Sequence, residues 1–291
     1  MNKYIITADD TADLPASFYE QHEVPLLHLS YVVNDIEYDG VTSALTIAEF
    51  YDKIRNGAMP YTQQVNPESA RCLFERLVKE GYDILHIAFS SGLSGTYNSA
   101  RMGALEVQET YPDAKITVID SLCASMGEGL LLHEVVARKE AGMEYDTLVN
   151  WVEENKLRLV HEVVADDLNH LHRGGRLSKV SAILGTALSV KPIIHVNDEG
   201  KLINIAKQRH KGMALKFIAN RLADRIETED GLDTIGISHS DCIDDVNRLV
   251  ELIKEKTGIE KFIISDIGPV IGSHTGIGTL AVFYFAKGRQ V

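Results

Sequence analysis

A loop rich in hydroxyl side chains lies between a predicted buried strand (Ile84 to Phe89) and a predicted helix (Tyr97 to Glu109). Its hydroxyl residues are Ser90, Ser91, Ser94 and Thr96. At a helix N-terminus, the free backbone N–H groups and the positive end of the helix dipole favour an anion. The same residues are also typical of a tight turn in which Ser or Thr caps the helix. From this loop alone, an anion site and a structural turn both remain open.

Two known catalytic motifs are absent from this loop. No lysine follows its glycines, so it is not a Walker loop. Ser94 is followed directly by Gly95, so the G-x-S-x-G nucleophile elbow is also missing. Nucleotide hydrolysis and α/β-hydrolase chemistry therefore lose support.

A second candidate loop, Gly268 to Gly278, follows a predicted strand and presents Ser273, His274 and Thr275 on adjacent positions. It contains a G-x-G-x-x-A pattern ending at Ala281 that superficially matches the dinucleotide fingerprint. Too few residues follow Ala281 to complete a βαβ unit, so we do not expect a dinucleotide site. A glycine-rich binding loop and a turn into a last edge strand remain as alternatives.

Metal binding has weak support in the sequence. Two His-Glu pairs, at 133–134 and 161–162, begin the HExx pattern, but the fifth position is alanine in both, so the imidazole pair that holds zinc is missing. Acidic and imidazole side chains also occur close together at Asp166, Asp167, His170 and His172. An acidic first turn of a short helix explains this group more simply. We expect neither a metal nor a cofactor.

Two further charged groups allow a functional and a structural interpretation. Arg173-Gly174-Gly175-Arg176 is a cationic turn suited to a carboxylate or a phosphate, or equally a helix end with two solvated arginines. Asp9 and Asp10 could form an acid/base pair, although a turn or cap before Pro15 is the stronger interpretation.

Composition narrows the class of protein. Of the 291 residues, 45% are hydrophobic and 24% are charged, which is typical of a folded globular protein. The formal charge of −13 at pH 7 would repel nucleic acids and anionic lipid headgroups, so we expect neither as a partner. The three cysteines form no C-x-x-C pair, which argues against a disulfide framework. Without a long apolar run or an apolar N-terminus, we expect a cytoplasmic protein with no membrane segment.

The predicted elements form two parts. Strand-like and helix-like segments alternate in the first half, which is typical of βαβ units and a parallel sheet. A capping box at Thr46 and Glu49 and the Asn66-Pro67 pair mark two helix starts there. After residue 165 the order becomes β-β-α-β-α-β, typical of an α+β sandwich, with a hairpin turn at 197–200. We predict two directly packed domains, 1–165 and 166–291.

Taken together, these segments resemble the DegV family of bacterial fatty-acid-binding proteins. The matching segments run in family order over nearly the whole chain: Ile5 to Asp9, Ser90 to Ser99 (SSGLSGTYNS), Val118 to Ser121 with Ser125 to Gly127, Arg173 to Ser178, and Gly268 to Gly278 (GPVIGSHTGIG). The resemblance implies a DegV-like α/β fold with two lobes. The first would be a Rossmann-like parallel sheet with flanking helices, and the second an α+β sandwich that closes over the lipid.

The resemblance also implies a binding site. The threonine of the family's T-S-Q-P loop falls on Thr62 and the serine of its G-L-S-G loop on Ser94, and these hydroxyls would hold the carboxylate of a fatty acid. His274 would stand near the same headgroup. The chain departs from the usual family pattern at Asp10, Gln63, Val65 and Ile277. The anchoring threonine is retained.

The function implied by the resemblance is that of a non-enzymatic carrier of a long-chain fatty acid such as palmitate or oleate. Burial of roughly 14 methylenes at about 0.8 kcal/mol each makes tight binding plausible before ordering costs are subtracted. Family relatives present the fatty acid to the ATP-binding subunit of a fatty acid kinase, and Arg173 and Arg176 are candidates for docking such a partner. The alternative is a serine-dependent hydrolase or acyltransferase that uses Ser94 with His274 as its base.

Overall fold

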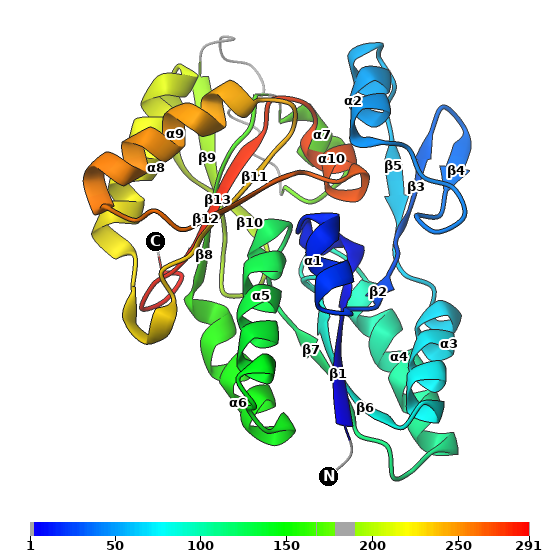
Figure 1. The fold of residues 1–291 in the computed structure, drawn as a ribbon. Helices are drawn as coiled ribbons and strands as arrows, with labels where there is room; N and C mark the ends of the chain where they lie inside the picture. Colours follow the sequence, from blue (N-terminus) through cyan, green and yellow to red (C-terminus); the bar gives the residue numbers. More distant parts are fainter. Residues whose placement is uncertain (1–2, 167, 178–189, 291) are drawn as a thin grey trace.

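The computed structural model describes residues 3–166, 168–177 and 190–290, which form two lobes (Figure 1). One lobe contains a four-stranded sheet and the other a six-stranded sheet, and a smaller three-stranded sheet lies beside them. This mixed α/β arrangement confirms the predicted fold class. Asp167 of the candidate metal group and Ser178 of the family motif lie outside the described residues.

The four-stranded sheet is parallel, and its strands are short apolar runs buried on both faces. Its order is β2 (Leu26–Leu27), β1 (Lys3–Asp9), β6 (Tyr82–Ala88) and β7 (Ile116–Asp120). One face packs against α3 (Pro67–Lys79) and α4 (Thr96–Thr110). The other packs against α5 (Met126–Glu140) and α6 (Tyr145–Asn155). Asn66 caps α3 through a hydrogen bond from the Glu68 N–H, as its sequence predicts.

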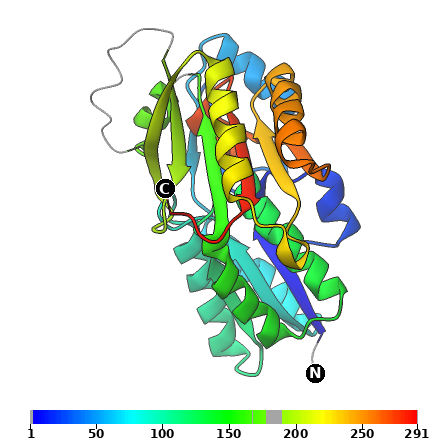
Figure 2. The same ribbon diagram turned by 90° about the vertical axis from the view of Figure 1, so that its left-hand side faces the viewer.

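The six-stranded sheet is mixed, because β11 and β12 are parallel while its other neighbours are antiparallel. Its order is β10 (Leu202–Arg209), β9 (Val190–Val196), β8 (Leu159–Val164), β13 (Leu280–Phe285), β11 (Ile235–His239) and β12 (Phe262–Asp266). The outer face is covered by α8 (Lys211–Arg225) and α9 (Ile243–Thr257), as Figure 2 shows. The predicted turn at 197–200 joins β9 to β10.

Helix α5 lies between the two large sheets. Its apolar side chains share one buried cluster with Ile6 and Leu85 of the parallel sheet and with Phe283 and Phe285 of the mixed sheet. Two glycines allow the close approach: a Cβ at Gly127 would lie 2.2 Å from Nε2 of His161, and one at Gly129 would lie 2.3 Å from the backbone oxygen of Ala12. The two lobes therefore pack directly and share part of their core.

Strand β8 pairs with β13 and β9, so it belongs to the six-stranded sheet. The domain boundary predicted at residue 165 would leave these residues in the first domain. In the structure the chain passes from the first large sheet to the second between α6 and β8, through the short 3-10 helix Lys156–Arg158. The apolar run of β8 would suit either sheet, and its neighbour β13 comes more than a hundred residues later in the chain.

A three-stranded antiparallel sheet, which the sequence analysis did not predict, consists of β3 (Ser30–Val33), β4 (Ile36–Tyr38) and β5 (Tyr61–Gln63). Helix α2 (Ile47–Arg55) starts at the predicted capping box of Thr46 and Glu49. In β5, Thr62 pairs with Tyr31 of β3. This sheet positions the threonine that the family resemblance singles out.

The glycine-rich segment after β12 forms a helix instead of an irregular loop. Helix α10 (Pro269–Thr275) begins with proline at its first turn and ends at Gly276, whose φ of 71° is readily adopted only by glycine. It packs against β3, β5 and α7 (Asn169–Arg173). The strand that follows it, β13, lies inside the six-stranded sheet, so the interpretation of this segment as a turn into an edge strand is wrong.

No helix within the described ranges is both long and apolar enough to cross a lipid bilayer.

Replacing Gly92 with alanine should destabilise the contact between the lobes. The added Cβ would lie 2.6 Å from the backbone oxygen of Glu199 and 2.8 Å from the Gly200 carbonyl, both in the turn between β9 and β10. Because backbone must move to relieve this overlap, we expect a loss of about 1–3 kcal/mol in the free energy of unfolding, measured by urea denaturation. Gly288→Ala is the control, since nothing lies within 4 Å of its added Cβ. Equal stability of the two variants would contradict this packing.

Candidate functional site

A cavity with mostly apolar walls lies between the lobes. The space between its atoms, including the part open to solvent at its mouth, is about 780 Å³. Its apolar walls come from both lobes: Leu29, Phe89, Leu93 and Ala124 from the first, and Val163, Leu171, Ile194, Val196, Leu202, Ile267, Val270, Ile271, Ala281 and Phe283 from the second. Such a lining suits a hydrocarbon chain. The polar side chains among the wall residues decide what headgroup the cavity accepts.

Thr62 and His274 meet at the wall of this cavity. The hydroxyl oxygen of Thr62 in β5 lies 2.7 Å from Nε2 of His274 in α10, and the two residues are 212 positions apart in the sequence. Close packing fixes the other side of the ring, because a Cβ at Gly174 would lie only 2.4 Å from Nδ1 of His274. The structure thus brings together two of the site residues that the family resemblance implies.

Ser94 lies in the turn between β6 and α4 and also lines the cavity. Its hydroxyl oxygen accepts a hydrogen bond of 3.2 Å from the Thr96 N–H and lies 3.0 Å from the Thr96 hydroxyl oxygen. Ser94 therefore has the structural role of a helix-start residue and also faces the cavity. Because the 15-residue helix α4 directs the positive end of its dipole to this point, negative charge is favoured there.

The charge at this part of the wall is positive. Burial, together with the nearby charges of Arg176 and Arg173, lowers the pKa of His274 to about 4, so its ring is neutral at pH 7. Arg176 also lines the cavity, where its Nε donates a hydrogen bond of 3.1 Å to the Leu93 carbonyl. Burial lowers the pKa of Arg176, but a guanidinium remains protonated in proteins. A neutral imidazole, two hydroxyls and one cation together suit an anionic group.

Arg173 takes a different position from Arg176. It is exposed, and its guanidinium contacts the Met59 sulfur and donates a hydrogen bond of 3.3 Å to the Pro60 carbonyl. From the sequence, both arginines are equally candidates for docking a partner. In the structure, Arg176 lines the cavity and Arg173 lies on the surface beside the strand that carries Thr62.

The acidic candidates have structural partners. Asp9 accepts a hydrogen bond of 2.8 Å from the Phe89 N–H, whereas Asp10 accepts one of 3.2 Å from the Leu29 N–H and lies 3.1 Å from Nδ1 of His28. These separate partners favour the turn interpretation over an acid/base pair. Asp166 forms an ion pair of 2.9 Å with Lys191. Within the part of the chain that the structure describes, no three His, Cys, Asp or Glu side chains are grouped to hold a metal ion.

Three polar wall residues, Ser125, His161 and Thr279, were not identified from the sequence as part of the site. Nε2 of His161 accepts a hydrogen bond of 3.2 Å from the Ala124 N–H. Burial lowers the pKa of His161 well below its usual value, so this ring is also neutral. The segment 121–125 follows the end of β7, next to the Ser94 loop at the end of β6, and this placement at neighbouring strand ends is the signal that could have drawn attention to Ser125.

Comparison with known proteins gives consistent matches over the full chain. A family model described as an uncharacterised protein of the DegV family matches residues 3–287. A DegV domain-containing protein of Clostridium perfringens is 44% identical over 291 residues, which is 100% of both chains. A solved fatty-acid-binding DegV family protein of Streptococcus agalactiae is 30% identical, with a TM-score of 0.86 and coverage of 99% of this chain and 100% of its own. DegV from Bacillus subtilis, described as a fatty-acid-binding protein, is 27% identical, with a TM-score of 0.83 and the same coverage.

His274 should show no titration between about pH 5 and 8 when its ring is followed by NMR, since its pKa is lowered to about 4. Arg176→Gln should raise this pKa, because removing a nearby positive charge favours the protonated imidazole. A titration midpoint near the usual value of about 6.5 in the unaltered protein would contradict the burial of this ring.

Proposed function

Because the chain belongs to the DegV family, we propose that it binds a long-chain fatty acid between its lobes, with the carboxylate at Thr62 and Ser94. The observation that carries this proposal is the group of polar side chains formed by Thr62, Ser94, Arg176 and His274 on a mostly apolar cavity. Solved relatives from Streptococcus agalactiae and Bacillus subtilis are described as fatty-acid-binding proteins. A headgroup site joined to an apolar space is the arrangement that an amphipathic ligand requires.

The hydrogen bond between Thr62 and His274 can leave the threonine proton free for a carboxylate. If the neutral His274 ring carries its proton on Nε2, it donates to the Thr62 oxygen, and the threonine hydroxyl then has its own proton available for a carboxylate oxygen. Ser94 supplies a second hydroxyl at the positive end of α4. Arg176 adds positive charge, which stabilises the ionised form of the ligand.

The hydrocarbon tail supplies the affinity in this proposal. Each buried methylene contributes about 0.8 kcal/mol of gross driving force, whereas a hydrogen bond to a charged group contributes about 1.5–3 kcal/mol. A C16 or C18 chain such as palmitate or oleate therefore gains more from the apolar walls than from the headgroup contacts. The headgroup contacts determine which end of the ligand occupies the polar wall.

The serine-dependent enzyme is the weaker alternative because of the geometry of its candidate base. Nε2 of His274 bonds to Thr62, while the Ser94 hydroxyl bonds to Thr96. A general base must lie within hydrogen-bond reach of the nucleophile that it activates. Both side chains instead bond to other residues of the cavity wall or its loop, and this geometry supports a non-enzymatic carrier.

We further propose that the bound carboxylate is presented to the ATP-binding subunit of a fatty acid kinase, as the family resemblance implies. Arg173 is exposed and contacts Met59. Met59 and Tyr61, whose exposed fractions are 60% and 56%, provide apolar surface next to Thr62. Arginine and aromatic side chains are frequent in protein interfaces. Arg173 is therefore our candidate for docking the partner, and Arg176 for holding charge at the carboxylate.

The double variant Thr62→Ala, Ser94→Ala should lose its fatty acid and keep its fold. The loss of two hydrogen bonds to a charged group should weaken oleate binding by roughly 100-fold or more, measured by calorimetry. Mass spectrometry of the denatured protein, purified without detergent, should detect a C14 to C18 fatty acid in the unaltered chain and little in the variant. Ser91→Ala is the matched control, because Ser91 is an exposed residue of the same loop. Unchanged oleate affinity in the double variant would contradict the assignment.

Arg173→Glu should leave fatty-acid retention intact and abolish phosphorylation of the bound carboxylate by the partner subunit with ATP. Charge reversal at an exposed docking residue acts mainly on association with the partner. The assay follows acyl phosphate formation from protein loaded with labelled oleate. Unchanged phosphorylation by Arg173→Glu would argue against this docking role.

A further inference from the structure

The Asp13 carboxylate connects three parts of the molecule where the lobes meet. It follows the 3-10 helix Asp10–Ala12 and is only 6% exposed. One of its oxygens accepts a hydrogen bond of 2.9 Å from the Gly268 N–H in the second lobe. The other accepts a hydrogen bond from the hydroxyl of Ser125, which lines the cavity. The Ser125 oxygen in turn lies 2.9 Å from the hydroxyl of Ser238 in β11.

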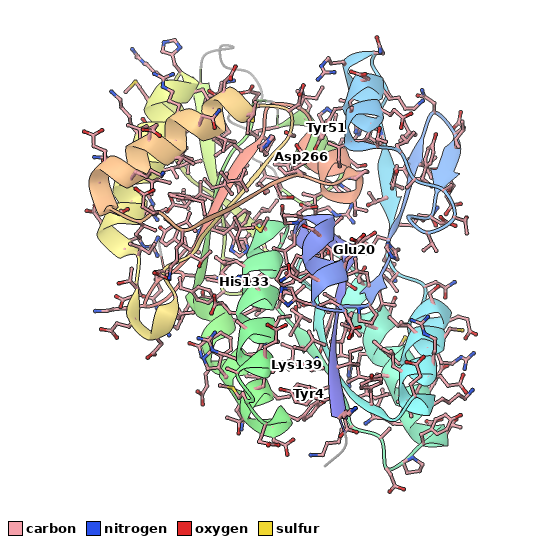
Figure 3. The ribbon with its side chains drawn as sticks, in the orientation of Figure 1. Tyr4, Glu20, Tyr51, His133, Lys139 and Asp266 are labelled. Carbon is pink, nitrogen blue, oxygen red and sulfur yellow. The ribbon has the colours of Figure 1, made fainter. Side chains whose placement is uncertain are left out.

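Gly268 is the residue at which α10 begins. Four residues of this helix line the cavity: Val270, Ile271, His274 and Thr275. A second side chain of the first lobe bonds to the backbone just before α10: the Tyr51 hydroxyl in α2 donates a hydrogen bond of 2.7 Å to the Ile267 carbonyl. Figure 3 labels Tyr51 and Asp266 at this junction between α2 and the connection from β12 to α10. The start of α10 is thus held from the first lobe at two consecutive residues.

Space at this junction is tight. A Cβ at Gly268 would lie 2.8 Å from Oδ1 of Asp13, and one at Gly272 would lie 2.7 Å from the Tyr51 hydroxyl oxygen. Glycine at both positions lets these two side chains approach the helix backbone. The position of α10 therefore depends on Asp13 and Tyr51, although neither side chain belongs to the proposed carboxylate site at Thr62 and His274.

We propose that Asp13 is a positioning residue for fatty-acid binding: its carboxylate fixes the start of α10 and, through this helix, holds His274 against Thr62 at the cavity wall. This inference rests on the proposed function. It assigns to Asp13 an effect on ligand affinity that operates through the position of α10 and of Ser125, without contact between Asp13 and the ligand.

The ionisation of Asp13 gives this role a measurable signature. Burial raises the pKa of Asp13 to about 7, against the lowering effect of the bonds from Ser125 and Gly268. Above this pH the carboxylate accepts both hydrogen bonds, whereas protonation turns one acceptor into a donor and weakens the hold on α10 or Ser125. Ligand affinity should therefore fall as the pH is lowered through about 7.

Other ionisable groups also surround Asp13. The ionisable side chains that face it are Asp10, Tyr19, Tyr51, Glu128 and Asp266. Burial raises the pKa of Glu128 well above its usual value, and burial also raises the pKa values of both tyrosines. Burial also raises the pKa of Asp10, although its hydrogen bond with His28 opposes this shift. His239, 3.7 Å from Asp266, has its pKa lowered by burial.

The test compares Asp13→Ala with Asp13→Asn in the full chain, with oleate labelled with ¹³C at its carboxyl carbon. Alanine removes both hydrogen bonds and should weaken oleate binding roughly tenfold at pH 8, with a shift of the His274 ring resonances. The asparagine oxygen can still accept from Gly268, and its amide can donate to Ser125 if that hydroxyl turns to Ser238. Asparagine therefore reproduces the hydrogen-bonding pattern of the protonated acid, so this variant should bind oleate at pH 8 about as weakly as the unaltered protein does at pH 6, more tightly than Asp13→Ala, and with no fall between pH 8 and 6.

Controls separate this inference from the proposed function. Asp113→Ala, on an exposed loop, should leave affinity and its pH dependence unchanged. If the unaltered protein does not bind oleate, the proposed function fails. If it binds oleate while a folded Asp13→Ala has the same affinity and an unmoved His274 resonance, the positioning role alone is overturned. Should Asp13→Ala not fold, two other variants test the proposal. Tyr51→Phe removes the hydrogen bond to the Ile267 carbonyl, which is the second hold on α10. Unchanged oleate affinity in Tyr51→Phe, together with an unchanged pH dependence of affinity in Asp13→Asn, would overturn the proposal.

Discussion

The hydrogen bond between Thr62 and His274 is the interaction on which the arrangement of the site depends. A polar side chain in an apolar wall costs free energy unless it has a partner. Here a strand of the first lobe and a helix of the second each supply one half of a 2.7 Å contact. The pairing of β5 with β3 positions Thr62, and the hydrogen bonds of Asp13 and Tyr51 at the start of α10 position His274. The site exists only where both lobes are assembled.

A net charge of −13 does not prevent this cavity from accepting an anion. Charges on the surface are screened over about 8–10 Å in physiological salt, so the groups at the wall dominate the local potential. Those groups are the Arg176 guanidinium, the neutral His274 ring and the start of α4. Asp13 and Glu128 are not among the wall residues: Asp13 bonds to Ser125, which lines the cavity, and burial raises the pKa of Glu128 well above its usual value, which favours its neutral form. The net charge therefore disfavours an anionic ligand, whereas the groups at the cavity wall favour one. The proposed binding depends on the groups at the wall.

Local signals in the sequence predicted local structure well. The capping box at Thr46, the Asn66 cap and the hairpin turn at 197–200 all depend on residues a few positions apart, and the structure contains each of them. The family motifs identified Thr62, Ser94 and His274, and the structure places all three on one cavity. The sheet membership of β8 and the role of Asp13 could not be predicted, because their partners in β13 and α10 come more than a hundred residues later. Periodicity carries no information about such distant contacts.

Helix α5 has a consequence for how the protein folds. Its side chains complete the cores beside both large sheets, so neither lobe has a finished apolar interior without it. Separation of the lobes would expose one side of this helix to water, at a cost proportional to the apolar area uncovered. We therefore expect the two lobes to unfold as a single cooperative unit, in one transition, because neither half keeps a complete apolar core without the other.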